Sequence, residues 1–486
     1  MQLLQRNITA WVQELLDISP IVVIEGARQV GKSTLTGMID NANTTFTTMD
    51  DDLTRTFAHD DPAGFLSSAK EGRLVIDEIQ RCPELILPLK AVVDNDRRPG
   101  RFVLTGSANL LRLPGAQDSL AGRAMTARLH PFSQGELEGH KEDWVSWLLS
   151  PDRRKAQEAD RSNVITRLTV GGYPLVQSMS PRVRTAWLKD YANRLVQRDA
   201  SDMAQTRIPI LGQLLQLLAA APGAELVQDR LAQKLKVTRG TVVRYSDLLE
   251  SLFLIHRLPA WSRNLTKRQI QRPKVFLTDT GLNAALSNMD AAHLSSMQGA
   301  DHLGPLLEQF VVCELLRQQG WSATPFKLFH YRDRQGAEVD IIVETPTGII
   351  AVEVKSAVAA TARHFQHFKA LRDRLGDEFL AGIVLTTGTG QKAGDRLESL
   401  PISSLWSRWD GTRSHRPIAA QDQPKRHPGA YRSRTAPIPQ PSCPGTDAGM
   451  VSCGLIDDLG SNPHFSKLTR RCSAASMLRG PEVHMA

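Results

Sequence analysis

The strongest constraint on how this chain folds is a run of fourteen residues near its N-terminus. It reads Ile-Val-Val-Ile-Glu-Gly-Ala-Arg-Gln-Val-Gly-Lys-Ser-Thr over residues 21–34. An apolar run, a loop bounded by two glycines and a polar helix start follow one another, which predicts a strand, a tight loop and a helix. Glycine lets such a loop curl until successive backbone N–H groups point at one place. Because the positive end of the following helix points there too, the sequence predicts an anion-binding loop.

The spacing of the loop matches Gly-x-x-x-x-Gly-Lys-[Ser/Thr], which is typical of proteins that bind nucleoside triphosphates. Lys32 can reach the β- and γ-phosphates, and the hydroxyl group of Ser33 is placed to bind the Mg²⁺ that a triphosphate carries. The alternative is a glycine-rich turn before an ordinary helix. The predicted triphosphate-binding residues are Gly26, Ala27, Arg28, Gln29, Val30, Gly31, Lys32, Ser33 and Thr34.

A second strand is predicted over residues 73–77, where an apolar run ends in two carboxylates. The carboxyl ends of the strands in an α/β sheet border the crevice in which ligands bind. We expect Asp77 to hold Mg²⁺, directly or through water, and Glu78 to orient and polarise the attacking water. This acid pair follows the phosphate loop by about 45 residues, as expected of a triphosphatase.

A third strand, over residues 101–104, runs into polar residues at 105–109. Ser107 or Asn109 is the candidate for sensing the γ-phosphate, and simple turn chemistry is the alternative. Further along, Arg123 could stabilise the charge of the transition state, either in its own chain or across a subunit boundary. The competing interpretation of Arg123 is an ordinary surface arginine.

Four segments together resemble the prokaryotic AAA+ ATPase family in which a domain of unknown function, DUF4143, follows the ATPase. They are the phosphate loop 26–33, the strand ending in Ile76-Asp77-Glu78, and residues 104–107 and 120–123. The resemblance extends to about residue 400. It implies an ATPase with ATP and Mg²⁺ as cofactors and a parallel sheet of order 5-1-4-3-2. It also implies a homo-oligomer in which Arg123 faces the nucleotide of a neighbour.

The middle of the chain is predicted to be helical. Residues 136–205 are interpreted as a helical lid and connector, and residues 206–265 as a winged-helix-like segment with two short helices around a tight turn. If this segment binds DNA, Arg239, Thr241 and Arg244 on the second helix would approach the major groove. The alternative is that the same module packs against its neighbours or against a protein.

Residues 266–405 are predicted to form an α/β module with a hairpin from two apolar runs, at 337–343 and 349–356. Glu353 and Lys355 share one face of the second strand, and Asp340 on its partner can lie close to them. Asp340 and Glu353, with Glu308 from an upstream helix, could hold Mg²⁺, while Lys355 positions or deprotonates a water that attacks a phosphodiester. The arrangement resembles the PD-(D/E)xK nuclease fold, although a valine precedes the first aspartate where that pattern has proline.

Length and composition limit the possibilities further. A chain of 486 residues is too long for one hydrophobic core, so an α/β ATPase domain at 1–135 followed by further domains is expected. The formal net charge is +8, but residues 411–486 carry ten basic and five acidic side chains, so bulk charge gives no argument for DNA binding by the folded part. That proline-rich tail, from about residue 406, is expected to be disordered.

The N-terminus lacks the uninterrupted apolar core of a signal peptide, and no apolar stretch approaches membrane-spanning length, so a cytoplasmic protein is expected. Two functions remain open from the sequence. The first is an ATPase whose hydrolysis drives a winged-helix and nuclease-like module, with DNA as a candidate partner. The second is a nucleotide-gated switch in which an inactive nuclease-like module grips a protein partner.

Overall fold

The N-terminal part of the chain forms a parallel sheet of five strands in the order β2-β3-β4-β1-β5 in this computed structural model. This is the order that the resemblance implied, read from the other edge, so the expectation is confirmed. Each strand is five residues long. Their bounds are β1 Ile21–Glu25, β2 Thr44–Thr48, β3 Arg73–Asp77, β4 Phe102–Gly106 and β5 Ala124–Arg128.

The structure describes residues 3–39, 43–69, 72–107, 116–199, 208–264, 268, 271–333 and 336–411. All of them belong to one compact unit, Met1–Arg416, and a second unit, Pro417–Ala486, lies outside the described residues. Asn109 also lies outside them, as does the tail beyond residue 411. Trp406, which the sequence analysis placed at the start of the tail, is fully buried in the core.

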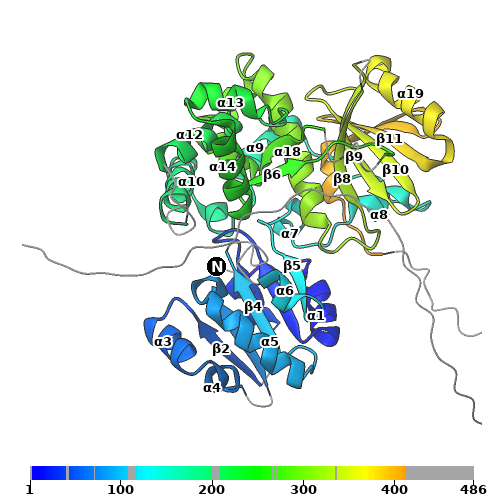
Figure 1. The fold of residues 1–486 in the computed structure, drawn as a ribbon. Coiled ribbons are helices and arrows are strands. Elements are labelled where there is room, and N and C mark those ends of the chain that lie inside the picture. The colour runs from blue at the N-terminus through cyan, green and yellow to red at the C-terminus, as the bar shows by residue number, and fades with distance from the viewer. Residues whose placement is uncertain are drawn as a thin grey trace, which may run out of the picture. The chain divides into compact units, whose positions relative to one another are not determined.

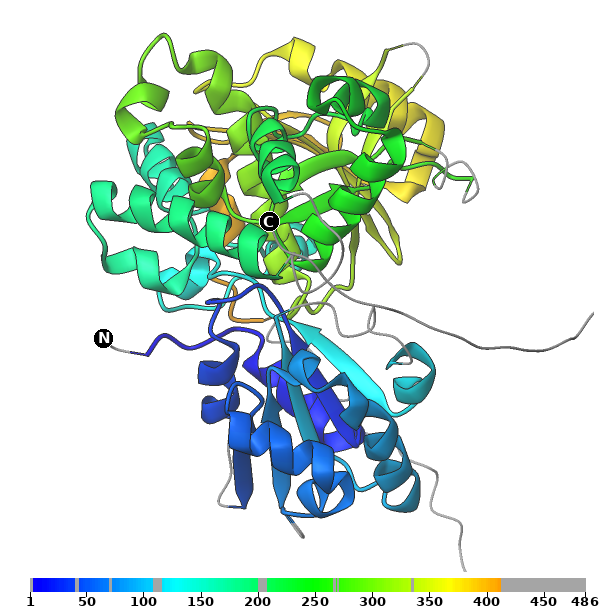
Figure 2. The ribbon, with the colours of Figure 1, turned by 60° about the vertical axis from the view of Figure 1, so that its left-hand side comes forward.

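Helices cover both faces of the N-terminal sheet because its central strands are apolar on both sides. In β1, Val22 and Ile24 pack into one core cluster, whereas Ile21 and Val23 pack into another. Figures 1 and 2 show these helices, in blue, flanking the sheet. Their bounds are α1 Thr9–Ile18, α2 Lys32–Met38, α3 Asp52–Asp60, α4 Pro62–Leu66, α5 Ile86–Asn95 and α6 Ala116–Leu120.

The middle of the chain is helical, as predicted, and ends in a two-stranded antiparallel sheet of β6 and β7. The second helix of the predicted pair, α14, begins after Thr238, whose hydroxyl group accepts a hydrogen bond from the N–H group of Thr241. The bounds are α7 Gln134–Leu137, α8 Trp144–Leu149, α9 Arg161–Val170, α10 Pro181–Arg194, α12 Ile208–Ala219, α13 Gln228–Leu235, α14 Arg239–Ser251, β6 Ile255–Leu258 and β7 Lys274–Leu277.

The C-terminal part is built on a mixed sheet of six strands in the order β12-β13-β11-β10-β9-β8. The predicted hairpin is present as the antiparallel pair β9 and β10, and β10 then pairs with β11 in parallel. The bounds are α16 Thr280–Leu286, α17 Ala291–Ser295, α18 Ala300–Gln318, β8 Lys327–Arg332, β9 Glu338–Thr345, β10 Gly348–Val354, α19 Gln366–Leu375, β11 Phe379–Thr386, β12 Gln391–Gly394 and β13 Leu397–Pro401.

The two faces of this second sheet are covered by different helices. Phe310 of α18 packs with Ile341 and Ile350 on one face, whereas Phe368 of α19 packs with Ile342 and Ala351 on the other. Because side chains alternate along a strand, the hairpin is apolar on both faces. Figure 1 shows α19 lying against β9, β10 and β11.

Helix α8 packs in the core beside the C-terminal sheet, although in the sequence it comes soon after the N-terminal sheet. Trp144 is buried in the same core cluster as α18, its backbone N–H group donates to Gln318 Oε1 at 2.7 Å, and its indole N–H group donates to Ser404 Oγ at 3.1 Å. The start of the segment predicted as a lid therefore packs far along the chain, against residues 318 and 404.

Candidate functional site

The phosphate loop joins the buried strand β1 to helix α2, as its sequence predicts. A Cβ atom on Gly26 would lie 2.1 Å from the carbonyl oxygen of Leu129, so only glycine fits there. Gly31 has a φ of +97°, in the left-handed region, and caps α2. These two positions explain why the loop needs a glycine at each end.

Side chains from outside the loop hold its backbone in place. The hydroxyl group of Tyr191 on α10 donates to the carbonyl oxygen of Arg28 at 2.9 Å, and Arg6 donates to the carbonyl oxygen of Val30 at 2.9 Å. Arg6 also pairs with Glu136 Oε1 at 3.1 Å, and both side chains are almost fully buried. The curl of the loop is therefore fixed by contacts with the N-terminal segment, α7 and α10.

Lys32 lies inside the curl of the loop. Its ammonium group donates to the carbonyl oxygens of Gly26 and Ala27 at 3.0 and 3.1 Å, and it lies 3.9 Å from Glu78 Oε1. Its side chain is 5% exposed. The positive charge that would contact a triphosphate is thus held at the centre of the loop, where the uncharged carbonyl groups of Gly26 and Ala27 accept its hydrogen bonds.

Asp77 and Ser33 meet at the carboxyl end of the sheet. Ser33 Oγ donates to the Asp77 carboxylate at 3.1 and 3.2 Å, and Thr105 at the end of β4 donates to the same carboxylate. Burial raises the pKa of Asp77, while the hydrogen bond from Thr105 acts in the opposite direction. A hydroxyl and a carboxylate side by side are the oxygen ligands that Mg²⁺ uses, so these residues fit the ion.

Glu78 lies beside this pair, in a turn with a φ of +56°. Ser107 Oγ donates to Glu78 Oε2 at 2.9 Å, and Gln80 donates to both Glu78 and Ser107. The predicted sensor Ser107 and the predicted catalytic Glu78 are therefore brought together. Sequence reasoning missed Thr105 and Gln80; a polar residue at the end of an otherwise apolar strand was the available signal for Thr105.

Arg123 lies elsewhere. It precedes β5, its carbonyl oxygen accepts from the N–H group of Ile21 at the start of β1, and β1 separates it from the loop by roughly 15 Å. Its guanidinium group forms a two-point contact with Asp94 on α5, at 2.7 and 2.8 Å. The structure thus places Arg123 at the opposite end of β1 from the phosphate loop of its own chain.

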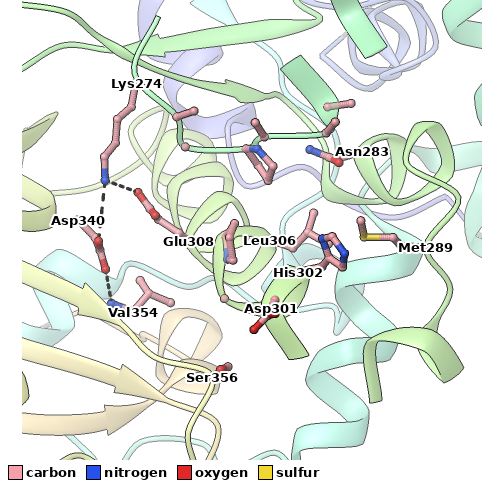
Figure 3. A pocket seen from close by; sticks show the side chains of 18 of the residues that line it. Lys274, Asn283, Met289, Asp301, His302, Leu306, Glu308, Asp340, Val354 and Ser356 are labelled. Carbon is pink, nitrogen blue, oxygen red and sulfur yellow. Dashed lines mark hydrogen bonds and ion pairs between the residues drawn. The ribbon is translucent and has the colours of Figure 1, made fainter. Parts of the chain in front are cut away.

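The predicted nuclease residues meet beside a pocket of about 600 Å³ that is lined by the middle and C-terminal parts and is called the C-terminal pocket (Figure 3). Glu308 extends from α18, and Asp340 from β9 accepts a hydrogen bond from the backbone N–H group of Val354 at 2.9 Å. Glu353 and Lys355 form an ion pair of 2.6 Å. Burial raises the pKa of Glu308 to about 8 and that of Glu353 to about 7, and the charge of Asp340 adds to both shifts.

A lysine that the sequence analysis did not single out lies among these carboxylates. The ammonium group of Lys274, at the start of β7, is 2.9 Å from Glu308, 3.1 Å from Glu338 and 3.8 Å from Asp340. Burial alone would lower the pKa of Lys274, but the three carboxylates outweigh it and the pKa is raised. In the sequence, the only indication of a role for Lys274 was its charge at the start of an apolar run.

The predicted magnesium ligands of this second site do not fit the ion as they stand. Lys274 takes Glu308 and Asp340, while Lys355 takes Glu353. Across the part of the chain that the structure describes, no group of three or more His, Cys, Asp or Glu side chains is arranged to hold a metal ion. The carboxylates of this second site are thus paired with lysine side chains, whereas Asp77 at the phosphate loop accepts hydrogen bonds from hydroxyl groups.

Comparison with protein families agrees with this division of the chain. Residues 19–138 match the model of an AAA domain, and residues 303–405 match a domain of unknown function, DUF4143. This chain joins a region similar to an AAA domain to a region similar to DUF4143. Between the AAA domain and that region, residues 161–293 match a further domain of unknown function, DUF8612, which includes Lys274.

Two curated relatives align with most of this chain. An uncharacterized protein of Mycobacterium tuberculosis is 28% identical over 353 residues, which cover 72% of this chain and 74% of that protein. An uncharacterized protein of Haemophilus influenzae is 24% identical over 327 residues, which cover 65% of this chain and 74% of that protein. The names of these two relatives state no activity.

Comparison with solved structures gives matches to parts of this chain. A RuvB variant from Thermotoga maritima is 18% identical over 52% of this chain and 89% of its own, with a TM-score of 0.25. A signal transduction ATPase from Pyrococcus horikoshii is 12% identical over 63% of this chain and 44% of its own, with a TM-score of 0.24. At such scores the likeness supports no inference about function.

The length and polarity of the helices decide whether any of them could span a membrane. Among the described residues, each helix is too short or too polar to cross a lipid bilayer.

Proposed function

We propose that this chain is a Mg²⁺-dependent ATPase that couples ATP hydrolysis to its middle and C-terminal modules, with DNA as the macromolecule on which it acts. The observation that carries the proposal is the contact of Ser33 with Asp77 at 3.1 and 3.2 Å, beside Lys32. These residues come from β1–α2 and β3, whose carboxyl ends meet at the same edge of a parallel sheet. That edge is where α/β sheets bind their ligands.

Each residue of this site has a distinct role in the proposal. The backbone of residues 26–33 and the ammonium group of Lys32 bind the triphosphate, and Ser33 and Asp77 would hold Mg²⁺. The ion supplies positive charge that stabilises the phosphates in the transition state. Glu78 orients the attacking water and accepts its proton, and Ser107 positions the Glu78 carboxylate through their 2.9 Å hydrogen bond.

Phosphate release with Mg²⁺ and ATP tests this proposal directly. Glu78→Gln should bind ATP like the wild type but release phosphate at least about a hundred-fold more slowly, because the general base is lost. Lys32→Ala should weaken ATP binding itself, since a phosphate-binding charge is removed. Wild-type phosphate release no faster than that of Glu78→Gln would refute the proposed hydrolysis.

A winged helix is the proposed DNA-binding element. Helices α13 and α14 followed by the β6–β7 sheet have its order, and Arg239 and Arg244 on α14 are both exposed. Phosphate release should rise when DNA is added, and Arg239→Ala with Arg244→Ala should weaken DNA binding at low salt. A rate and an affinity that neither DNA nor this double variant alters would contradict the DNA assignment.

A second candidate function is favoured by Lys274. A C-terminal module of PD-(D/E)xK type whose carboxylates pair with lysines suits a nucleotide-gated switch that grips a protein partner without cutting DNA. Incubation with supercoiled and branched DNA and Mg²⁺ or Mn²⁺ separates the two candidates. The switch predicts no cleavage, whereas cleavage that Lys355→Ala abolishes would support a nuclease. Cleavage identical in the wild type and Lys355→Ala would defeat the nuclease.

A further inference from the structure

The buried ammonium group of Lys274 makes three ion pairs inside the pocket of the C-terminal part. Its distances to Glu308, Glu338 and Asp340 are 2.9, 3.1 and 3.8 Å, and its side chain is only 6% exposed. Figure 3 shows Lys274 extending towards Glu308 and Asp340 from the strand opposite them. A positive charge therefore already lies where these carboxylates converge.

The lysine and its partners come from different parts of the chain. Lys274 lies within the region that matches DUF8612, whereas Glu308, Glu338 and Asp340 lie within the region that matches DUF4143. The backbone of Lys274 is fixed by β6, where it pairs with Leu258, and by a bridge to Glu225. The middle module thus delivers the cation to the carboxylates of the C-terminal module.

Asp340 and the neighbouring Glu353 have further partners beside the cluster. One oxygen of Asp340 accepts from the N–H group of Val354 at 2.9 Å, and Glu353 pairs with Lys355 at 2.6 Å. A divalent cation needs about six oxygen ligands at roughly 2.0–2.6 Å. An ion bound by Glu308 and Asp340 would lie within a few ångströms of the Lys274 ammonium group, and at that separation two buried positive charges repel strongly.

We propose that Lys274 is an internal cation that takes the place of a divalent metal ion in this pocket, so that the resting chain binds neither Mg²⁺ nor Mn²⁺ there. Removing its charge while keeping its length converts the cluster of Glu308, Glu338 and Asp340 into a site for a divalent cation. The inference concerns the C-terminal pocket alone and does not depend on hydrolysis at the phosphate loop.

The test is a titration of the nucleotide-free full chain with Mn²⁺, followed by the electron paramagnetic resonance signal of the free ion. We compare the wild type with Lys274→Met and with a matched control, Lys369→Met, in which an exposed lysine of α19 outside the pocket is removed. Lys274→Met should bind one additional Mn²⁺ at least about ten-fold more tightly than the wild type, since the repelling charge is gone. Adding Asp340→Asn to Lys274→Met should abolish this binding, and Lys369→Met alone should behave like the wild type.

All of these proteins keep Ser33 and Asp77, so weak Mn²⁺ binding at that site is the same in each. It cancels when the Mn²⁺ binding of each variant is compared with that of the wild type. Two results would overturn the inference. One is Mn²⁺ binding by the wild type that Asp340→Asn abolishes, a measurement that does not require the Lys274 variant to fold. The other is a folded Lys274→Met chain with no gain in Mn²⁺ binding.

Thermal unfolding gives a second readout of the same inference. Loss of Lys274 leaves Glu308 and Asp340 as buried carboxylates without a cation, which lowers the unfolding temperature. Mn²⁺ should then raise the unfolding temperature of Lys274→Met but not that of the wild type, because only the variant has a place for the ion. An equal rise in both proteins would contradict the proposal.

Discussion

Two regions of this chain place a lysine beside carboxylates at the ends of strands, and they use the lysine in opposite ways. At the phosphate loop, Lys32 donates to the carbonyl oxygens of Gly26 and Ala27 and lies 3.9 Å from Glu78, and Asp77 is held by hydroxyl groups. In the C-terminal pocket, Lys274 pairs directly with Glu308 and Asp340. The same residue types therefore give one site prepared for a metal ion with its nucleotide and one that is neutralised from within.

The comparison teaches that the partner of the lysine decides what a carboxylate cluster can bind. A carbonyl oxygen carries only a partial charge, so an incoming phosphate can replace it at the ammonium group. A buried carboxylate cannot be separated from its cation without leaving an uncompensated charge, which costs several kcal/mol. Two sites that look alike as motifs in a sequence thus differ in function once the pairing is known.

The largest expected effect concerns how the first site is completed. Arg123 lies at the opposite edge of the sheet from the loop, so we expect it to serve a neighbouring chain, unlike Lys274, which completes its site from within the same chain. Arg123→Ala should then lower ATP hydrolysis about a thousand-fold with ATP binding retained. An equimolar mixture of Arg123→Ala and Glu78→Gln chains should regain about a quarter of the wild-type rate.

Phosphate release measured at several mixing ratios checks this arrangement. An unchanged rate in Arg123→Ala would identify it as a surface arginine paired with Asp94. A mixture that stays inactive would rule out a contribution across a subunit boundary.

A hundred-fold effect is expected from the shape of the loop. In Gly26→Ala, the new Cβ atom would collide with the carbonyl oxygen of Leu129 at 2.1 Å, so the loop must shift and lose phosphate contacts. Losing two such hydrogen bonds corresponds to about a hundred-fold weaker ATP binding. Gly37→Ala in α2 is the matched control, because nothing lies within 4 Å of its Cβ and the helix gains about 1 kcal/mol.

Equilibrium binding of a fluorescent ATP analogue to both glycine variants measures this difference. Equal affinities in the two variants would mean that the loop does not contact the phosphates. Neither Gly26→Ala nor Gly37→Ala should alter the C-terminal pocket, because no glycine-bounded phosphate loop joins its described strands.

The smallest effect concerns the pH dependence of stability in the second region. Burial, together with the charge of Asp340, raises the pKa of Glu353 from 4.5 to about 7. The folded chain therefore holds this proton more tightly than the unfolded chain, and the group reduces stability as the pH rises from about 4.5 to about 7. Glu353→Gln should gain about 1–3 kcal/mol relative to the wild type between pH 5 and pH 7.5.

Urea unfolding of both proteins at the two pH values gives this difference, and Glu344→Gln, whose carboxylate pairs with Arg268 at the far end of β9, serves as the control. The pKa of Glu344 is lowered from 4.5, so its contribution to stability is lost only below about pH 4.5, and the effect of Glu344→Gln should be nearly constant between pH 5 and pH 7.5. If the difference in unfolding free energy between the wild type and Glu353→Gln does not vary with pH, the pKa of Glu353 is not raised in the folded chain.

Much of the first region could be predicted from the sequence because its signals are local. The glycines and Lys32 follow one another in a fixed spacing, and Asp77 and Glu78 directly follow an apolar strand. The order of the sheet followed from the resemblance. Thr105 was missed because a single hydroxyl at the end of a strand gains its meaning only from the neighbouring strand that carries Asp77.

The second region was predicted in its parts but not in its chemistry. The hairpin and the proximity of Asp340 to Glu353 followed from alternation along two strands, which is again local. Lys274 lies 34 residues before Glu308 and 66 before Asp340, and no periodicity links them. The pairing of Arg123 with Asp94 was missed for the same reason, since both contacts arise from tertiary packing.

The central claim is that a triphosphate and its metal ion bind at the phosphate loop and not in the C-terminal pocket. Crystals of Glu78→Gln grown with ATP and Mn²⁺ test it most directly, because the anomalous signal of manganese locates the ion. We predict a triphosphate along the backbone of residues 26–33, with a manganese peak between Ser33 and Asp77 and none at Glu308 and Asp340. A nucleotide bound away from Lys32, or a manganese peak among the carboxylates around Lys274, would contradict the account.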